Sequence, residues 1–343
     1  MDPEEKFKLI MRNVQEVVTE EELKALLEKK KQPVVYIGTA ITGKPHVAYF
    51  IFINKLADFL KAGFKVKLLL ADLHGALDNT PWPLLEARYK YYNKIIPLMF
   101  KAIGANIKNF EIVRGSDFQL DKKYFYDVLR MSTFTSVHDC TKAASEIVKM
   151  GSSPKLSGLI YPIMQALDEV YLKVDIQYGG LDQRKILMFA REYLPKIGYQ
   201  ARIELMTPMI PGLAGGKMSA SDVKSKIDLL DSPENVNTKL AGAYCPAGKL
   251  EDNSVLAFLK HVVMVLKEDK REELTIKRPV KFGGDISYKT YAELEKDFVA
   301  EKLHPQDLKN ALAEEINKLL YPIREGMKGQ DKLIKEAYPE EKT

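Results

Sequence analysis

Short apolar, β-branched runs alternate with helical segments through the first half of the chain, and this alternation restricts the fold more than any other feature. The strand-like runs cover residues 34–37, 65–71 and 110–114, and the helical segments between them cover 47–62 and 82–103. A strand followed by a helix and a second strand usually pairs with that strand in parallel, because the crossover needs a connection of helix length. We therefore predict an α/β fold with a doubly wound parallel sheet, whose ligand sites lie at the carboxyl ends of its strands.

The same alternation divides the chain into parts. Residues 1–31 predict a helical extension, and residues 32–228 predict the α/β domain, in which 174–180 forms a fourth strand. Helical patterns dominate afterwards, so 229–343 is predicted to be a mostly helical second domain. Residues 118–152 are rather apolar for a surface, and we expect a partner to cover them.

Composition excludes several classes of protein. Hydrophobic residues make up 46% and charged residues 29% of the chain, which supplies a core and excludes wholesale disorder. The net charge of +5 permits a polyanionic partner without requiring one. Cys140 and Cys245 stand far apart without a CxxC spacing, which excludes a disulfide scaffold and a zinc site. The chain shows neither an apolar run of about 18 residues nor a patterned leader, so we expect a cytoplasmic protein without a membrane partner.

The first motif that bears on chemistry is YIGTAITGKPHVAY, residues 36–49. It nearly matches a phosphate-binding P-loop, with Gly38, Gly43 and Lys44 in place. Pro45 stands where a P-loop needs Ser or Thr and a backbone N–H, so a P-loop NTPase is a poor interpretation.

A better interpretation is a helix that begins at Pro45. His46 and Tyr49 then share its first turn, where the positive end of the helix attracts phosphate and the imidazole can donate a hydrogen bond. Thr39 and Thr42 add hydroxyl groups nearby. A histidine near a helix start is also commonly a cap or a surface residue, and the motif by itself leaves both interpretations open.

A second motif is PGLAGGKMSAS, residues 211–221. Glycines around one lysine, followed by hydroxyl residues, describe a loop that can fold over a polyphosphate. Lys217 would supply the charge, and Ser219 and Ser221 the hydrogen-bond donors. An ordinary surface loop has the same composition, so two interpretations remain here as well.

A third group combines YPIMQALD, residues 161–168, with QYGGLDQRK, residues 177–185. Tyr161, Gln165 and Asp168 form one polar stripe on an otherwise apolar helix. Burying such a stripe without partners is costly, which favours a polar ligand, although a solvated face is the simpler alternative.

Together these motifs resemble those of the class I aminoacyl-tRNA synthetases, and most closely those of the tyrosyl-tRNA synthetases of archaeal and eukaryotic cytosolic type. Residues 46–49 (HVAY) resemble the HIGH signature and 217–221 (KMSAS) the KMSKS signature, and the YxxxQxxD and GGxDQ patterns accompany them. Ala48 and Tyr49 depart from the first signature, and Ala220 takes the place of the second lysine of the other. The resemblance covers essentially the whole chain.

The resemblance implies a fold and a reaction. It implies a Rossmann-like catalytic domain, followed by a C-terminal helical domain that binds the anticodon. ATP and L-tyrosine would react to tyrosyl-adenylate and pyrophosphate, and the tyrosyl group would then pass to the 3′ end of tRNA(Tyr). Mg²⁺ would accompany the ATP, with no permanent metal or organic cofactor. Positioning and charge stabilisation would supply most of the rate.

The resemblance also implies roles for individual residues. The catalytic group would consist of His46, Lys217, Thr39, Ser219 and Ser221. Tyrosine would be bound by Tyr36 and Asp168 at its hydroxyl, by Tyr161, Gln165 and Gln183 at its amino group, and by His74 along the pocket. ATP would be bound by Gly38, Tyr49, Gly180, Asp182 and Met218.

Two segments of the second domain, KFGG (281–284) and HPQDLKN (304–310), resemble anticodon-binding motifs of the same branch. By that match Phe282 would stack on an anticodon base, and His304 and Asp307 would form hydrogen bonds with the first anticodon base. A core aromatic is the alternative for Phe282. The region 118–152 matches the segment where family members dimerise, which implies a homodimer with tRNA, and not DNA, as its nucleic-acid partner.

Two rival hypotheses remain. A tryptophanyl-tRNA synthetase has a similar fold and similar signatures, but an indole would leave the polar pair Tyr36 and Asp168 buried without a partner. An RNA-binding protein that kept the fold and lost the chemistry is the other rival, and the presence of His46, Lys217 and Asp182 weighs against it.

Overall fold

The central element of the protein is a six-stranded sheet. The computed structural model describes residues 1–148, 151, 153–215 and 226–339. The strand order is β1-β6-β5-β2-β3-β4, in which β2 to β6 are parallel and β1 pairs antiparallel with β6. The strands are β1 (Glu16–Val18), β2 (Val34–Ala40), β3 (Lys65–Ala71), β4 (Phe110–Arg114), β5 (Ile176–Gly180) and β6 (Ile203–Thr207). The prediction of a doubly wound α/β sheet is confirmed, with one antiparallel edge strand added.

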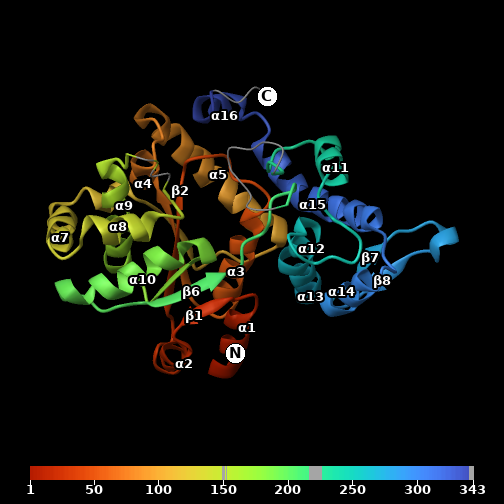
Figure 1. The fold of residues 1–343 in the computed structure, drawn as a ribbon, viewed down its shortest axis with the longest axis horizontal. Coiled ribbons are helices and arrows are strands. Elements are labelled where there is room, and N and C mark those ends of the chain that lie inside the picture. The colour runs from red at the N-terminus through yellow and green to blue at the C-terminus, as the bar shows by residue number, and fades with distance from the viewer. Residues whose placement is uncertain (149–150, 152, 216–225, 340–343) are drawn as a thin grey trace.

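Helices cover both faces of this sheet (Figure 1). They are α3 (Tyr49–Lys61), α4 (Asp72–Leu77), α5 (Leu85–Ile103), α6 (Ser116–Gln119), α9 (Leu156–Tyr171) and α10 (Arg184–Tyr193). The N-terminal extension forms α1 (Pro3–Met11) and α2 (Glu20–Lys29), as predicted, with β1 between them. Asp2 and Thr19 cap these two helices through side chains that accept hydrogen bonds from the first-turn backbone.

The region 118–152 contains α7 (Lys122–Ser132) and α8 (Val137–Ala144), at the left edge of the molecule in Figure 1. Several large apolar side chains on and beside these helices are exposed: Leu120, Phe125, Tyr126, Leu129, Phe134 and Val137. We call this group the α7–α8 apolar patch. It agrees with the sequence-based observation that this region is apolar for a surface.

The C-terminal part is mostly helical, as predicted. It contains α11 (Pro233–Ala241), α12 (Ser254–Phe258), α13 (Met264–Lys270), α14 (Tyr291–Val299), α15 (Pro305–Met327) and α16 (Asp331–Ala337), with a hairpin of β7 (Leu274–Ile276) and β8 (Ile286–Tyr288). Helices α15 and α16 both pack against α5, so the end of the described chain returns to the α/β part (Figure 1).

One apolar cluster joins the two parts. It runs from the sheet and its helices into the C-terminal helices, and it includes Phe50 and Tyr92 on one side and Val262 and Leu320 on the other. Over the described ranges, no helix is both long and apolar enough to cross a membrane.

Candidate active site

The candidate site lies where the chain reverses direction in the sheet. The chain passes from β2 outward to β3 and β4, and then returns to β5 on the other side of β2. Ligands of doubly wound folds bind at such a switch point, at the carboxyl ends of the strands. Gly38 and Thr39 lie near the end of β2, and Gly180 ends β5. Asp182 and Gln183 follow in the 3₁₀ turn Leu181–Gln183.

A buried carboxyl group stands at the centre of one half of this site. Asp168 on α9 is 1% exposed, and its Oδ1 accepts hydrogen bonds from Gln119 Nε2 and the Tyr124 hydroxyl, both at 2.8 Å. Burial raises the pKa of Asp168 to about 8, although the hydrogen bonds from Gln119 and Tyr124 act in the opposite direction. The carboxyl group of Asp168 therefore lies inside the candidate site with a pKa close to neutral pH, so a bound ligand can shift it from the protonated to the ionised form.

Tyr36 on β2 lies beside this carboxyl group. Its side chain is fully buried, and its hydroxyl donates to the backbone carbonyl of Gln165 at 3.3 Å. Burial, and after it the charge of Asp168, raises the pKa of Tyr36 well above its ordinary value, so the phenol stays neutral. The structure thus brings together Tyr36 and Asp168, the two residues that the family resemblance assigned to the hydroxyl group of tyrosine.

The remaining predicted pocket residues surround this pair. Gln165 Nε2 donates to Gln183 Oε1 at 3.2 Å, which connects α9 to the end of β5. The rings of His74 and Tyr161 meet edge to face at 4.6 Å between centroids, and His74 Nε2 lies 3.8 Å from Asp168 Oδ2. Burial lowers the pKa of His74 to about 4, so at neutral pH this contact joins a neutral imidazole to the carboxyl group.

Glycine at the end of β5 lets the turn pack closely. A Cβ on Gly180 would lie 2.7 Å from Asp182 Oδ1 and from Met209 Sδ, and a Cβ on Gly179 would lie 2.9 Å from Gln183 Cγ. Both distances are too short for real Cβ contacts. The side chains of Asp182 and Gln183 can therefore fold back over the strand end because the glycines leave that space open.

The second half of the site is the segment that carries the first signature. Thr39 Oγ1 lies 3.4 Å from the Tyr49 hydroxyl, and the rings of His46 and Tyr49 lie 5.3 Å apart, edge to face. Burial, and after it the charge of Lys226, lowers the pKa of His46 to about 4. Its Nδ1 is buried and has no hydrogen-bond partner among the described residues, so a donor or acceptor from a ligand could pair with it.

The predicted helix start is wrong. Helix α3 begins at Tyr49, four residues after Pro45, and His46 precedes it in a β-bridge with Asp228. The amide of Val47 also donates to the Ile227 carbonyl at 3.0 Å. The Tyr49 amide donates to the His46 carbonyl at 2.9 Å, so residues 46–49 form a turn that leads into α3. His46 therefore lies one turn before the helix and not within its first turn, although its ring still meets that of Tyr49.

Hydrogen bonds from distant elements hold the loop just before His46. The Gly43 carbonyl accepts from the hydroxyls of Tyr92 on α5, at 2.5 Å, and of Tyr338 after α16, at 3.0 Å. Arg88 donates to the carbonyl of Thr42 and, at 3.1 Å, to that of Ala337. The C-terminal end of the described chain therefore supports a loop of the candidate active site.

Four predicted site residues lie outside the described part of the chain: Lys217, Met218, Ser219 and Ser221. Ala220, which takes the place of the second lysine of the signature, also lies outside it. The segment that follows them, Lys226–Asp228, is described, and it forms the backbone contacts with His46 and Val47.

The predicted anticodon residues lie apart from the site, in the C-terminal helical part. Phe282 is 63% exposed, which rules out the core-aromatic interpretation. His304 caps α15 by accepting from the Gln306 amide at 3.1 Å, and Asp307 lies in the first turn of that helix. Arg278 connects the first segment to the chain just before the second, because it donates to the carbonyls of Gly284 at 2.9 Å and Lys302 at 3.1 Å.

Sequence reasoning missed Gln119 and Tyr124. Both donate to the Asp168 carboxyl group from α6 and α7. They lie in the region that was assigned to a partner interface, and no spacing in the sequence connects them to the polar stripe of α9. Tyr124 is buried on α7 together with Asp127, Val128 and Met131, so the sequence offers no signal that distinguishes it from a core residue.

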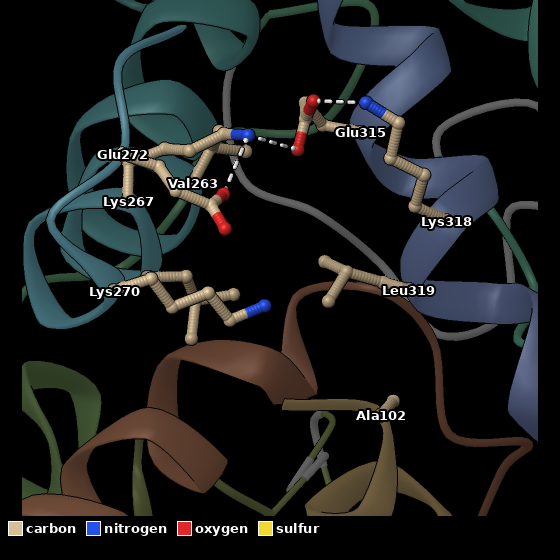
Figure 2. A pocket seen from close by; sticks show the side chains of 9 residues that line it. Ala102, Val263, Lys267, Lys270, Glu272, Glu315, Lys318 and Leu319 are labelled. Carbon is tan, nitrogen blue, oxygen red and sulfur yellow. Dashed lines mark hydrogen bonds and ion pairs between the residues drawn. The ribbon is translucent and has the colours of Figure 1, made fainter. Parts of the chain in front are cut away.

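A pocket elsewhere in the molecule is a weaker candidate for a site. A crevice of about 240 Å³ lies between α5, α13 and α15 (Figure 2). Lys267 there lies 3.3 Å from Glu272 and 3.4 Å from Glu315, which also pairs with Lys318 at 2.6 Å. Its charges are largely paired with one another, and none of the signature residues lines it.

Within residues 1–148, 151, 153–215 and 226–339, no cluster of three or more His, Cys, Asp or Glu side chains is arranged to hold a metal ion.

Comparison with known proteins identifies the family of the chain. Residues 28–321 match the family of class I tRNA synthetases for tryptophan and tyrosine (W and Y), and the chain therefore belongs to that family. Proteins similar to this chain include tyrosine–tRNA ligases. The cytoplasmic one of Danio rerio is 52% identical over 99% of this chain and 64% of its own length, and that of Haloarcula marismortui is 47% identical over 99% of each.

A solved structure with the same fold is the tyrosyl-tRNA synthetase of Archaeoglobus fulgidus complexed with L-tyrosine. It superimposes with a TM-score of 0.89 at 39% identity, and the match covers 95% of this chain and 100% of the other. The chain spans 64% of the length of the vertebrate relatives that it matches.

Proposed function

We propose that the chain is a tyrosine–tRNA ligase, which activates L-tyrosine with ATP and transfers it to the 3′ end of tRNA(Tyr). The observation that carries this proposal is the Asp168 carboxyl group, buried beside the neutral phenol of Tyr36 at the carboxyl end of the central strands. The names of the relatives support the same substrate. A tryptophanyl enzyme has less support, because indole has no hydroxyl group for this pair.

Tyr36 and Asp168 would select the substrate by its hydroxyl group. Asp168 in its ionised form accepts a hydrogen bond from the phenol, and Tyr36 can donate to the phenol oxygen. Phenylalanine would leave both groups buried without that partner, which costs about 1–3 kcal/mol for each group. Gln119 and Tyr124 keep the carboxylate oriented, while Tyr161, Gln165 and Gln183 would bind the amino group and His74 would line the pocket.

Activation requires the tyrosine carboxylate to attack the α-phosphate of ATP. His46 is neutral at pH 7, because burial depresses its pKa, so it would serve as a hydrogen-bond donor without a positive charge. Thr39, Ser219 and Ser221 would add donors, and Lys217 would supply the cation. Gly38, Tyr49, Gly180, Asp182 and Met218 would hold the rest of ATP.

Mg²⁺ would arrive with ATP and neutralise charge on its phosphates, which fits a site whose described residues form no metal cluster of their own. We propose no permanent metal or organic cofactor.

The two domains would have different roles in catalysis and in tRNA recognition. Residues 32–228 would form the Rossmann-like catalytic domain behind the extension 1–31, and 229–343 would bind the anticodon. Phe282 would stack on an anticodon base, and His304 and Asp307 would form hydrogen bonds with the first anticodon base. The exposure of Phe282 supports its role. The α7–α8 apolar patch supports a homodimer formed through residues 118–152. We place the protein in the cytoplasm, with no membrane or DNA partner.

Exchange of pyrophosphate into ATP, measured with each of the twenty amino acids, tests the activation step. We expect exchange with tyrosine and little with tryptophan or phenylalanine. Exchange that follows tryptophan, or no exchange with any amino acid, would contradict the proposal.

Charging of tRNA(Tyr) tests the second step and the anticodon assignment. Phe282→Ala should raise the KM for tRNA about tenfold, because stacking a base on an aromatic ring is worth about 1–3 kcal/mol. Val280→Ala, an exposed change in the same turn, is the matched control. Exchange without tRNA should stay unchanged in both variants, and equal KM values for tRNA would remove Phe282 from the anticodon site.

A further inference from the structure

A row of polar side chains crosses the central sheet under α9. Tyr36 on β2 is in register with Gln177 on β5, and Gln177 is in register with Glu204 on β6. Residues in register on neighbouring parallel strands point to the same face of the sheet. These three side chains are at most 2% exposed, at a level of the sheet where apolar packing would be expected.

A second buried carboxyl group, that of Glu169, acts electrostatically on this row. Glu169 follows Asp168 on α9, and it is 0% exposed, as is Glu204. In the part of the chain that the structure describes, all four carboxyl oxygens of Glu169 and Glu204 lack a hydrogen-bond partner, and so does Gln177 Oε1. Two buried carboxylates that accept no hydrogen bond cannot both be charged at low cost, so at least one proton is required between them.

The charged groups that face this pair are limited in number. Arg191 on α10 and Arg202 before β6 act on both glutamates and favour their ionisation, while Glu22 on α2 opposes it at Glu204. Arg191 is already committed, because it donates to the Glu22 carboxylate and to the Val18 carbonyl. The two arginines can thus balance some negative charge in this layer, but not three carboxylates.

Electrostatic coupling connects the pair to the candidate substrate pocket. The charge of Asp168 acts on Glu169, and the charges of Asp168, Glu169 and Glu204 all act on the Tyr36 hydroxyl. Burial raises the pKa values of both glutamates, and for Glu204 the charge of Glu169 is the next cause. The three carboxyl groups therefore titrate as one coupled system around one phenol.

We propose that Asp168, Glu169 and Glu204 share two protons and one negative charge, and that binding of tyrosine moves this charge onto Asp168. In the free protein Asp168 holds one proton, and the glutamate pair holds the other together with the charge. When the substrate hydroxyl donates to Asp168, the Asp168 proton leaves and protonates the remaining glutamate carboxylate. The pair thus consists of positioning residues, which keep the net charge of the buried layer constant.

This inference rests on the proposed function, because it requires tyrosine as the ligand. It makes a specific claim about protons. Tyrosine binding near pH 7 should release almost no proton to solvent, although a buried carboxyl group becomes ionised.

Calorimetric titration with L-tyrosine, in buffers of different ionisation enthalpy, measures that release. In the intact protein we expect release close to zero, as with L-phenylalanine. In the double variant Glu169→Gln/Glu204→Gln no carboxylate can take the proton, so tyrosine binding should release about half a proton or more beyond the phenylalanine value. Glu192→Gln, an exposed change on α10, should behave like the intact protein.

Infrared difference spectra of the unaltered protein give a second readout, which does not depend on a variant folding. With ¹³C-labelled aspartate, tyrosine should remove the C=O band of a protonated aspartate and add that of a protonated glutamate. Equal proton release in the intact protein and the double variant, or spectra without this exchange, would overturn the inference while leaving tyrosine binding intact. Absence of tyrosine binding would instead overturn the proposed function and the inference with it.

Discussion

The two halves of the candidate active site are held in opposite ways. Around Asp168, buried side chains fix one another, since Gln119 and Tyr124 donate directly to its carboxyl group. The segment from Thr42 to Val47 is held through its backbone, by Tyr92 and Tyr338 at the Gly43 carbonyl and by Ile227 at the Val47 amide. The first arrangement leaves little freedom for a side chain. The second fixes the chain path and leaves the Nδ1 of His46 without a hydrogen-bond partner in the part of the chain that the structure describes.

This difference matches two kinds of recognition. Tyrosine and phenylalanine differ by one hydroxyl group. Only desolvated and fixed hydrogen-bond partners make that group contribute a large difference in binding free energy. Holding a triphosphate requires a chain path that brings donors close to oxygen atoms, while charge can arrive from a separate loop or a cation. Mutations in the two halves should therefore separate into effects on selectivity and effects on nucleotide use.

The largest effect is expected for Asp168→Asn. This change removes the charge that accepts the substrate hydroxyl, and a buried hydrogen bond to a charged group is worth up to about 3 kcal/mol, hence about 100-fold in kcat/KM for tyrosine. The kcat/KM for phenylalanine should change little. Pyrophosphate exchange with both amino acids measures the ratio, with the exposed Asp117→Asn as control. A parallel loss for both substrates would mean that Asp168 supports the fold and does not read the hydroxyl.

A smaller effect is expected for His46→Ala. Loss of one donor to phosphate should lower kcat for exchange about 30-fold, because such a bond contributes about 2 kcal/mol, and selectivity among amino acids should not change. His138→Ala, on the surface of α8, is the control.

The pH dependence tests the charge state of His46. Burial lowers its folded-state pKa to about 4, so the stability that the neutral imidazole contributes is complete above the ordinary histidine pKa of about 6.5 and is lost progressively as the pH falls from there to about 4. Between about pH 5.5 and 8 the kcat of the intact protein should show no step that His46→Ala removes. A step near the ordinary histidine pKa that disappears in the variant would mean that the charged imidazole takes part.

The smallest effect is expected for Tyr338→Phe. This change removes one of the two hydroxyl groups on the Gly43 carbonyl, which is worth about 1 kcal/mol and should raise the KM for ATP about fivefold. The KM for tyrosine should stay the same, because Tyr338 donates to the loop at Gly43 and not to the group of side chains around Asp168. Tyr321→Phe, whose side chain is 64% exposed on α15, is the control. A rise in both KM values would show that the two halves are not independent.

Much of the sheet could be predicted because β2 and β3, which lie inside it, are short apolar runs, and the half-buried edge strand β4 is a run of the same kind. The runs at 34–37, 65–71, 110–114 and 174–180 are apolar enough to predict strands, and strands are found at all four places. The pattern missed β1, which has three residues, and β6, whose sequence IELMT carries the buried Glu204. A charge inside a strand contradicts the usual pattern, and the same charge belongs to the coupled carboxyl layer proposed above.

The site was predicted less completely, for a different reason. Tyr161, Gln165 and Asp168 could be placed together because one helix carries them. Gln119 and Tyr124 reach Asp168 only through the tertiary fold. The same is true of the β-bridge between Asp228 and His46. Contacts between segments so far apart leave no periodic trace in a single sequence.

The support of Gly43 by Tyr338 bears on how the protein is made. During synthesis on the ribosome, every strand of the central sheet emerges before α16 does, so the pocket around Asp168 can assemble early. The loop at Gly43 acquires its second hydroxyl partner only when nearly all of the described chain has been translated. A nascent chain would thus be able to recognise its amino acid before it holds its nucleotide firmly, and it would gain that second ability once Tyr338 has emerged and reached Gly43.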